Sequence, residues 1–114
     1  LFDTDFGFKE VDRDIFTSIL NNKDAYIGQI FNGLIKCNPF RQKFTDRALA
    51  IIGGAMRYER TSAIIDSIKS LISDEISHHG RRWGKNYNIE GKAADFKNFA
   101  KKRVATYIKH MNYI

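Results

Sequence analysis

The sequence predicts a mainly α protein, a compact antiparallel domain of about five helices behind a vestigial N-terminal strand. The first observation is that apolar residues recur every three or four positions from residue 12 onward, which is the spacing of one helix face. The second is that capping and helix-stopping residues separate these periodic segments. A chain of 114 residues can bury a core without disulfides, and its single cysteine, Cys37, is expected to be a small buried hydrophobe.

The first two predicted helices are short. Asp12 or Asp14 can cap the first helix by accepting hydrogen bonds from its first-turn amides, and this helix is expected to end at residues 21–22. Asp24 is expected to start the second helix, in which Gly28 and Gly33 either weaken the helix locally or allow a close contact with another helix. The apolar positions of this second helix are Ile27, Ile30, Phe31, Leu34 and Ile35.

The third predicted helix has the clearest start in the chain. Asn38 can accept hydrogen bonds from first-turn amides, and Pro39 loses no hydrogen bond at the first helical position. Gly53-Gly54 is expected to end this helix because glycine tolerates a positive φ. Its apolar stripe is formed by Phe40, Phe44, Ala48, Ile51 and Ile52.

Two longer helices complete the predicted domain. The fourth helix is expected over residues 59–79 with Gly80 as its stop, and residues 81–88 are expected to form a loop. The last helix is expected over residues 90–112. The apolar positions of this helix are Phe96, Phe99, Ala100, Val104, Tyr107, Ile108 and Met111.

These stripes predict which side chains form the core and which meet solvent. The expected core residues are Phe40, Phe44, Ile51, Ile68, Ile72, Phe99 and Tyr107, with Trp83 covering one end. The residues of the last helix that are expected to be exposed are Lys97, Lys101, Lys102 and Arg103.

The charge of the chain is positive and uneven. Lys and Arg number 19 against 13 acidic residues, which gives a net charge of +6. From residue 79 onward, Glu90 and Asp95 are the only acids among many lysines and arginines, so the C-terminal third is either a solvated helix face or a surface for acidic partners. The apolar runs are too short to span a bilayer, which needs about 20 residues.

Two motifs are candidates for chemistry. Asp3 and Asp5 follow an apolar opening and precede Gly7, so they form either a carboxylate site for a hard cation or a solvated turn. We assign residues 1–11 to the segment that carries this motif and residues 12–114 to the helical domain. The segment 81–84 (RRWG) either binds phosphate or has its tryptophan covering the core while its arginines satisfy helix C-terminal carbonyls. No other catalytic set stands out.

Several motifs in order resemble the C-terminal part of the spore coat protein H (CotH) kinase-like family. They are residues 1–7 (LFDTDFG), residues 38–47 (NPFRQKFTDR), residues 81–84 (RRWG), and a final helix with Phe99-Ala100 and Tyr107. The resemblance extends over nearly the whole chain. It implies the C-terminal helical part of a much reduced protein-kinase-like fold.

The resemblance also implies an activity for the full-length parent. Members of the family look like atypical, secreted or coat-associated kinases that phosphorylate serine in coat proteins with ATP and Mg²⁺ or Mn²⁺. In such a fold an acid near a strand end holds the cation that bridges the nucleotide phosphates, a role that the resemblance assigns to Asp3 and Asp5. It places the parent in the spore coat, at the cell surface or outside the cell.

The isolated chain is expected to be inactive and to need no cofactor, because phosphoryl transfer depends on groups that one acidic motif cannot supply. Its expected partners are the upstream kinase-like portion of the same protein and an acidic or serine-containing protein substrate. The alternative is a non-catalytic structural or binding module whose basic face recognises an acidic partner or nucleic acid. The D-x-D motif argues against nucleic acid, because acids weaken a basic nucleic-acid surface.

Overall fold

The computed structural model describes residues 7–114, and within this range it contains five helices and no strand. The helices are α1 (Ile15–Asn21), α2 (Tyr26–Ile35), α3 (Asn38–Gly53), α4 (Tyr58–Trp83) and α5 (Ile89–Met111). The predicted mainly α class with five helices is confirmed. The strand expected at the N-terminus, with Asp3 and Asp5, lies outside the described residues.

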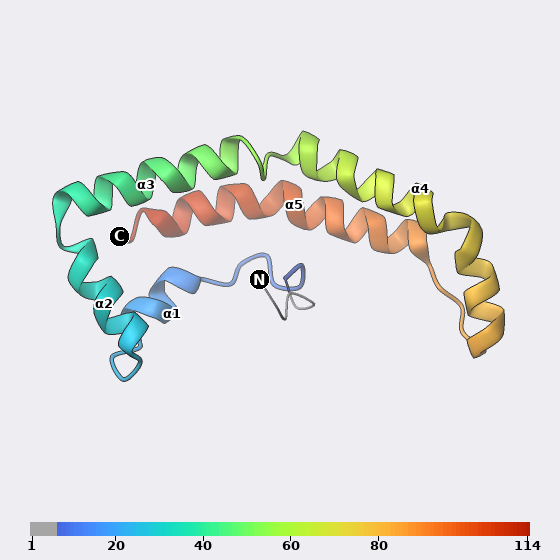
Figure 1. The fold of residues 1–114 in the computed structure, drawn as a ribbon, viewed down its shortest axis with the longest axis horizontal. Helices are drawn as coiled ribbons and strands as arrows, with labels where there is room; N and C mark the ends of the chain where they lie inside the picture. Colours follow the sequence, from blue (N-terminus) through green and yellow to red (C-terminus); the bar gives the residue numbers. More distant parts are fainter. Residues whose placement is uncertain (1–6) are drawn as a thin grey trace.

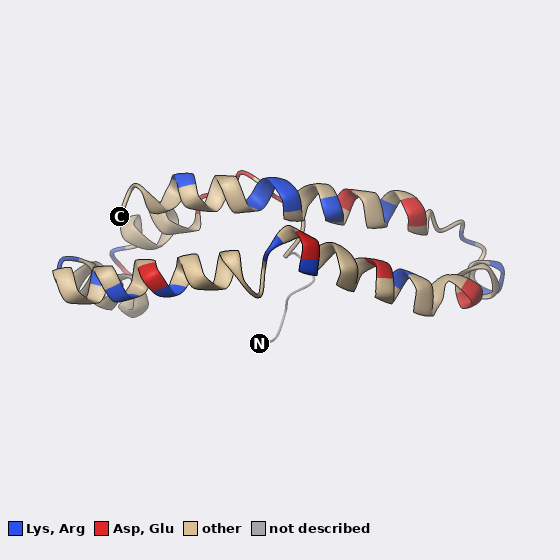
Figure 2. Ribbon diagram, turned by 90° about the horizontal axis from the view of Figure 1, so that it is seen from above, with Lys and Arg blue, Asp and Glu red and all other residues tan. Residues whose placement is uncertain are grey.

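The last helix is the centre of the arrangement. α3 and α4 follow one another in an arc, and α5 runs back antiparallel to both of them (Figure 1). α1 and α2 lie at the end of the arc where α5 finishes. Seen from above, α3 and α4 form one row and α5 forms a second row (Figure 2). The molecule is therefore elongated, with principal extents of 55 × 31 × 21 Å.

The buried core lies where α1, α3 and the C-terminal half of α5 meet. Its buried members are Phe16, Ala48, Ile52 and Met111, against which Phe44, Val104, Tyr107 and Ile114 pack; we call these eight residues the hydrophobic cluster. Phe16 is its centre, with 3% of its surface exposed. Its ring centroid lies 5.0 Å from that of Tyr107 and 6.1 Å from that of Phe44, in edge-to-face geometry.

The predicted core was only partly right. Phe44 and Tyr107 belong to the hydrophobic cluster, but Ile51, Ile68 and Ile72 are exposed. For the two α4 residues, the reason is that α4 continues the line of α3 instead of lying beside it, so α4 meets the N-terminal half of α5, away from the hydrophobic cluster (Figure 1).

Trp83 was expected to cover one end of the core, but 60% of its surface is exposed at the far end of α4. Cys37 was expected to be buried and is also exposed. Both residues stand at helix boundaries, where the apolar stripe of the helix does not determine the direction of the side chain.

Helix starts follow local hydrogen bonding. Asp14 caps α1, since its Oδ1 accepts from the backbone N–H of Phe16 and of Thr17, each at 3.0 Å, which confirms one of the two expected caps. α2 begins after Ala25, whose N–H donates to the Asn22 side chain at 3.2 Å, so Asp24 is not its cap.

The start of α3 differs from the prediction by one residue. Its N-cap is Cys37, and Pro39 stands in the first turn. Asn38 was expected to accept from backbone amides, but its side chain accepts from the Arg41 guanidinium instead. The helix ends at Gly53-Gly54 as predicted, although Gly54 has a φ of −108° and not a positive one.

Gly28 allows the close contact between α1 and α2 that the sequence suggested. A Cβ at this position would lie 2.2 Å from the backbone oxygen of Asn22 and 3.1 Å from that of Ile19. Beside it, Asn32 donates to the Leu20 carbonyl at 2.9 Å. The two short helices are therefore joined by a backbone approach that any larger residue would block.

The end of α4 corrects the prediction that Gly80 is its stop. The helix passes through Gly80 and continues to Trp83, so the first three residues of the expected loop are helical. Gly84 ends it with a φ of 62°, in the left-handed region that glycine adopts without strain. α5 then starts at Ile89, with the Asn88 side chain accepting from the Gly91 N–H at 2.9 Å.

Candidate functional site

The segment after the acidic motif lies along α5. Asp3 and Asp5 lie outside the described residues, and Gly7 is the first residue that the structure describes. Phe8 packs on two aromatic rings of α5, with centroid distances of 5.3 Å to Phe96 and 5.0 Å to Phe99. The chain that leads from the motif is thus attached to the middle of the last helix.

Arg103 provides the main polar attachment of this segment. Its Nη1 donates to the carbonyl oxygen of Val11 at 2.6 Å and to that of Arg13 at 2.8 Å. Arg103 was expected to be an exposed surface cation, and this prediction was wrong, because its guanidinium is used to hold the chain between the motif and α1.

Two cavities adjoin Gly7. One, of about 270 Å³, is lined by four charged residues, Lys9, Glu10, Arg13 and Arg103, together with Gly7, Ile15 and Phe99. The other, of about 290 Å³, is mainly apolar and extends from Gly7 and Phe8 toward Ile52 and Tyr107. In the apolar region, burial raises the pKa of the Tyr107 hydroxyl.

The described residues do not fit a divalent cation by themselves. Within residues 7–114 no group of three or more His, Cys, Asp or Glu side chains could hold a metal ion. In the first of these cavities Glu10 is accompanied by Lys9, Arg13 and Arg103, whose positive charges oppose cation binding. Asp3 and Asp5 lie outside the described residues, so their assignment as metal ligands stays a prediction. No reaction step through a metal or a nucleotide follows from residues 7–114.

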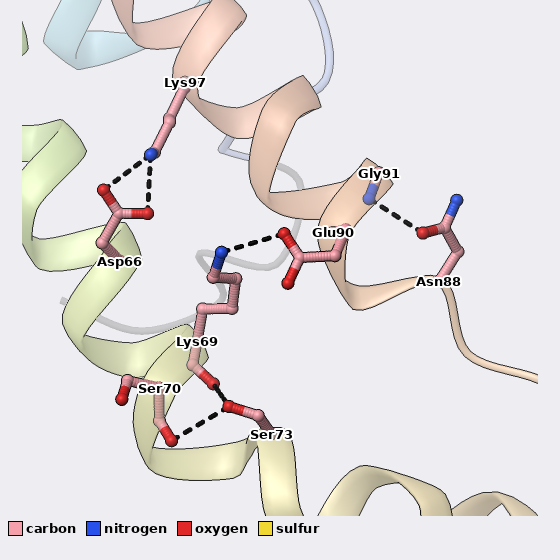
Figure 3. A network of polar contacts seen from close by, with 8 residues as sticks. All are labelled: Asp66, Lys69, Ser70, Ser73, Asn88, Glu90, Gly91 and Lys97. Atoms are coloured by element: carbon pink, nitrogen blue, oxygen red, sulfur yellow. Dashed lines mark hydrogen bonds and ion pairs between the residues drawn. The ribbon is translucent and has the colours of Figure 1, made fainter.

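Two ion pairs join α4 to α5 (Figure 3). Lys97 Nζ lies 2.6 Å from the Asp66 carboxylate, and Lys69 Nζ lies 2.9 Å from Glu90 Oε2. The hydrogen bond from Lys97 lowers the pKa of Asp66, and the hydrogen bond to Glu90 raises the pKa of Lys69. Lys97 was expected to be solvent-exposed, and this prediction was wrong, because its side chain is only 28% exposed and pairs with Asp66. Lys101 and Lys102, in contrast, are exposed as predicted.

The motif at residues 81–84 is exposed and not part of the core. Arg81 Nη2 lies 2.9 Å from His78 Nδ1, and the Arg82 guanidinium carbon lies 5.5 Å from the centre of the Trp83 ring. His79 contacts the rings of Trp83 and Tyr87, so the two adjacent histidines have different neighbours. The alternative in which Trp83 covers the core is wrong, whereas phosphate binding stays a prediction.

Sequence reasoning missed the roles of Arg103 and Lys97, although the spacing contained a signal. Arg103 stands four residues after Phe99 and four before Tyr107, which places it on the same helix face as both rings. Lys97 has the same relation to Ala93 and is three residues before Ala100, and both alanines are buried. Cations at these positions lie at the edge of the buried face, where long side chains reach across to a neighbouring element.

None of the helices in the described range is long and apolar enough to cross a membrane. The fold and the geometry define an all-helical domain in which a segment that follows an acidic motif is fixed to the last helix. A family model described as CotH kinase protein matches residues 1–107, so the chain belongs to the CotH kinase family. No curated protein and no solved structure gave a significant match.

Proposed function

We propose that this chain is the C-terminal helical portion of a CotH-like atypical protein kinase that phosphorylates serine in coat or exported proteins. The observation that carries the proposal is the family match over residues 1–107, which includes Asp3 and Asp5 as well as the segment 81–84. The family match establishes that the chain belongs to this family. The reaction, its cofactors and its substrate are what we propose.

In the proposed reaction Asp3 and Asp5 would hold Mg²⁺ or Mn²⁺, which would neutralise charge on the phosphates of ATP. The attachment of Phe8 and of residues 11–13 to α5 supports this assignment, because it gives the motif a rigid support on its C-terminal side. The remaining groups for phosphoryl transfer are assigned to the upstream kinase-like portion of the parent.

The exposed apolar surface supports a contact with that upstream portion. Ile64, Ile68 and Leu71 follow one another along α4 at helical spacing, and Leu71 has 79% of its surface exposed. α2 presents Ile27, Ile30 and Leu34 in the same way. Contiguous exposed apolar side chains commonly mark an interaction surface. We therefore expect the isolated chain to fold but to lack activity.

The test uses the full-length parent and a serine-containing coat-protein substrate. Asp3→Ala and Asp5→Ala should each reduce cation-dependent phosphorylation to background, while the helical circular dichroism stays unchanged. Asp12→Ala is the matched control, since it removes a nearby exposed carboxylate outside the motif. If both motif variants kept the wild-type rate, the metal assignment would be wrong.

A second experiment tests whether the isolated chain lacks kinase activity. The isolated 114-residue chain, supplied with ATP and Mg²⁺ or Mn²⁺, should neither hydrolyse the nucleotide nor phosphorylate the substrate. Phosphorylation by this chain alone would show that it contains the complete active site.

The alternative function is a non-catalytic module that binds an acidic partner through its basic face. Lys101 and Lys102 favour it, because both are exposed on the middle of α5, where Figure 2 shows the longest run of basic residues in that helix. The structure weakens this alternative at two positions, since Arg103 and Lys97 are engaged within the chain.

A further inference from the structure

The turn between α4 and α5 lies at one end of the molecule (Figure 1), and basic residues are found along it (Figure 2). Residues 76–88, which we call the basic corner, contain Arg81, Arg82 and Lys85 together with two histidines and no carboxylate. All three cations are exposed, and none forms an ion pair with an acid in the part of the chain that the structure describes. This differs from the hairpin that α4 forms with the first half of α5, where Lys69 and Lys97 are paired with acids.

The basic corner contains a cavity of about 490 Å³. Its polar lining residues are Ser77, Arg81, Lys85 and Asn86, whose side chains carry a hydroxyl, a guanidinium, an ammonium and an amide group. Tyr87 lines it as well, and no acidic residue does. Four hydrogen-bond donors of different kinds therefore surround one open space.

Backbone geometry forms this cavity. Gly84 reverses the chain with its φ of 62°, and the Lys85 N–H then donates to the Gly80 carbonyl at 2.9 Å. A Cβ on Gly80 would lie 2.5 Å from the Lys85 carbonyl oxygen, so the close approach requires glycine. The turn places Lys85 and Asn86 beside the last turn of α4, where the contact with His78 orients the Arg81 guanidinium.

A phosphate monoester matches this set of donors better than a carboxylate. It carries about two negative charges at neutral pH and three terminal oxygens, whereas a carboxylate has one charge and two oxygens. The C-terminal end of the α4 dipole opposes any anion, but its effect is about half a charge, which is less than the two full charges of Arg81 and Lys85. The exposed rings of Trp83 and Tyr87 provide apolar contacts on the flank.

We propose that the basic corner binds a phosphorylated serine within a protein segment. The anion site is inferred from the geometry of the corner, whereas the choice of serine rests on the proposed kinase function, whose product is a phosphoserine. The corner is a single cavity in the turn between α4 and α5, apart from Lys101 and Lys102 on the middle of α5. This arrangement favours a single phosphate over a nucleic-acid backbone, which presents a row of phosphates.

The test is a titration of the full chain with a short fluorescent peptide that contains one phosphoserine. Arg81→Gln with Lys85→Gln should weaken binding by about tenfold or more, because two charge-assisted contacts are removed. Lys101→Gln with Lys102→Gln is the control of equal charge change, and it should alter binding less than about twofold.

Further titrations, with altered peptides and with a second variant, identify the ligand. The same peptide with unmodified serine should not bind, and a glutamate in its place should bind more weakly than phosphoserine. Asn86→Asp, which adds a carboxylate to the lining and keeps Arg81 and Lys85, should weaken phosphopeptide binding by a similar factor and is the second variant if the double variant unfolds.

Three outcomes would overturn the proposal. They are equal losses in the two charge-matched double variants, equal binding of the modified and unmodified peptides, and tighter binding of duplex DNA than of the phosphopeptide through Arg81 and Lys85. The assay needs no catalysis, so a negative result would leave the kinase proposal standing. Conversely, loss of the kinase proposal would leave the anion site itself open to test with inorganic phosphate.

Discussion

The two ends of the molecule are stabilised in different ways. At the end where α5 finishes, the hydrophobic cluster joins α1, α3 and α5 around the nearly inaccessible ring of Phe16. Along the hairpin formed by α4 and the first half of α5, the specific links are the two ion pairs Asp66–Lys97 and Lys69–Glu90, and large apolar side chains such as Leu71 point to solvent. The first end thus contains a buried hydrophobic core, whereas the second end exposes large apolar side chains to solvent.

This difference indicates which part of the chain determines folding and which part determines binding. Burial of apolar surface contributes most of the stability of a domain, whereas exposed ion pairs contribute little. The hydrophobic cluster should therefore determine whether the chain folds, and the hairpin should determine what it binds. Both proposed contacts, with an upstream portion through Leu71 and with phosphoserine through the basic corner, lie on the hairpin.

The largest expected effect is at the hydrophobic cluster. Phe16→Ala should lower the free energy of unfolding by about 3–5 kcal/mol, because it removes a buried ring and leaves a cavity. Leu71→Ala, which truncates a large apolar side chain on the hairpin, should change it by only about 0.5 kcal/mol. Urea denaturation of both variants measures the two values. Similar losses would show that the two ends do not differ as described.

Arg103 tests the connection between the cluster and the acidic motif. Arg103→Ala removes both hydrogen bonds to the carbonyls of Val11 and Arg13, and it should cost about 1–3 kcal/mol. Amide hydrogen exchange should accelerate in residues 8–14 more than in α4. Lys102→Ala, one residue earlier and exposed, is the control. Unchanged exchange in residues 8–14 would mean that the ring contacts of Phe8 hold this segment without Arg103.

The sequence was sufficient to predict the helices but not their arrangement. Periodicity located all five, and local chemistry limited the first cap to Asp12 or Asp14 and predicted the end of α3 at Gly53-Gly54. It could not show that α4 continues the line of α3, because this depends on the few residues between the helices. That single difference turned Ile68 and Ile72 from expected core residues into exposed ones.

The candidate site could be predicted only as motifs. The D-x-D pattern and the segment 81–84 were visible in the sequence, and the family match includes both. The roles of Gly80 and Gly84 were not visible, because either glycine could have ended α4. Only tertiary geometry shows that Gly80 makes room for the returning chain, which is what creates the cavity beside Arg81.

A smaller effect is expected from pH at the hairpin. The hydrogen bond from Lys97 holds the folded-state pKa of Asp66 below its ordinary value of 3.8, so the carboxylate stabilises the fold above this pH and loses that contribution as pH falls through the lowered pKa. Asp66→Asn should therefore flatten the dependence of stability on pH in the acid range. The slope of stability against pH near neutrality should not change. Chemical denaturation at several pH values measures this slope. A slope equal to that of the wild type would show that the pair with Lys97 is not formed in solution.

The smallest effect on folding, and the clearest separation of folding from binding, is expected at Lys101 and Lys102. Both side chains are exposed on α5, so Lys101→Ala with Lys102→Ala should change the free energy of unfolding by no more than about 0.5 kcal/mol. Any attraction of these lysines for DNA should be independent of sequence and should weaken as salt increases, because it arises from the release of counterions from phosphates. For two contacts the slope of log K against log salt should be about −2. Titration with duplex DNA at low and moderate salt measures it, and tight, sequence-selective binding that survives moderate salt would favour the nucleic-acid module over the kinase portion.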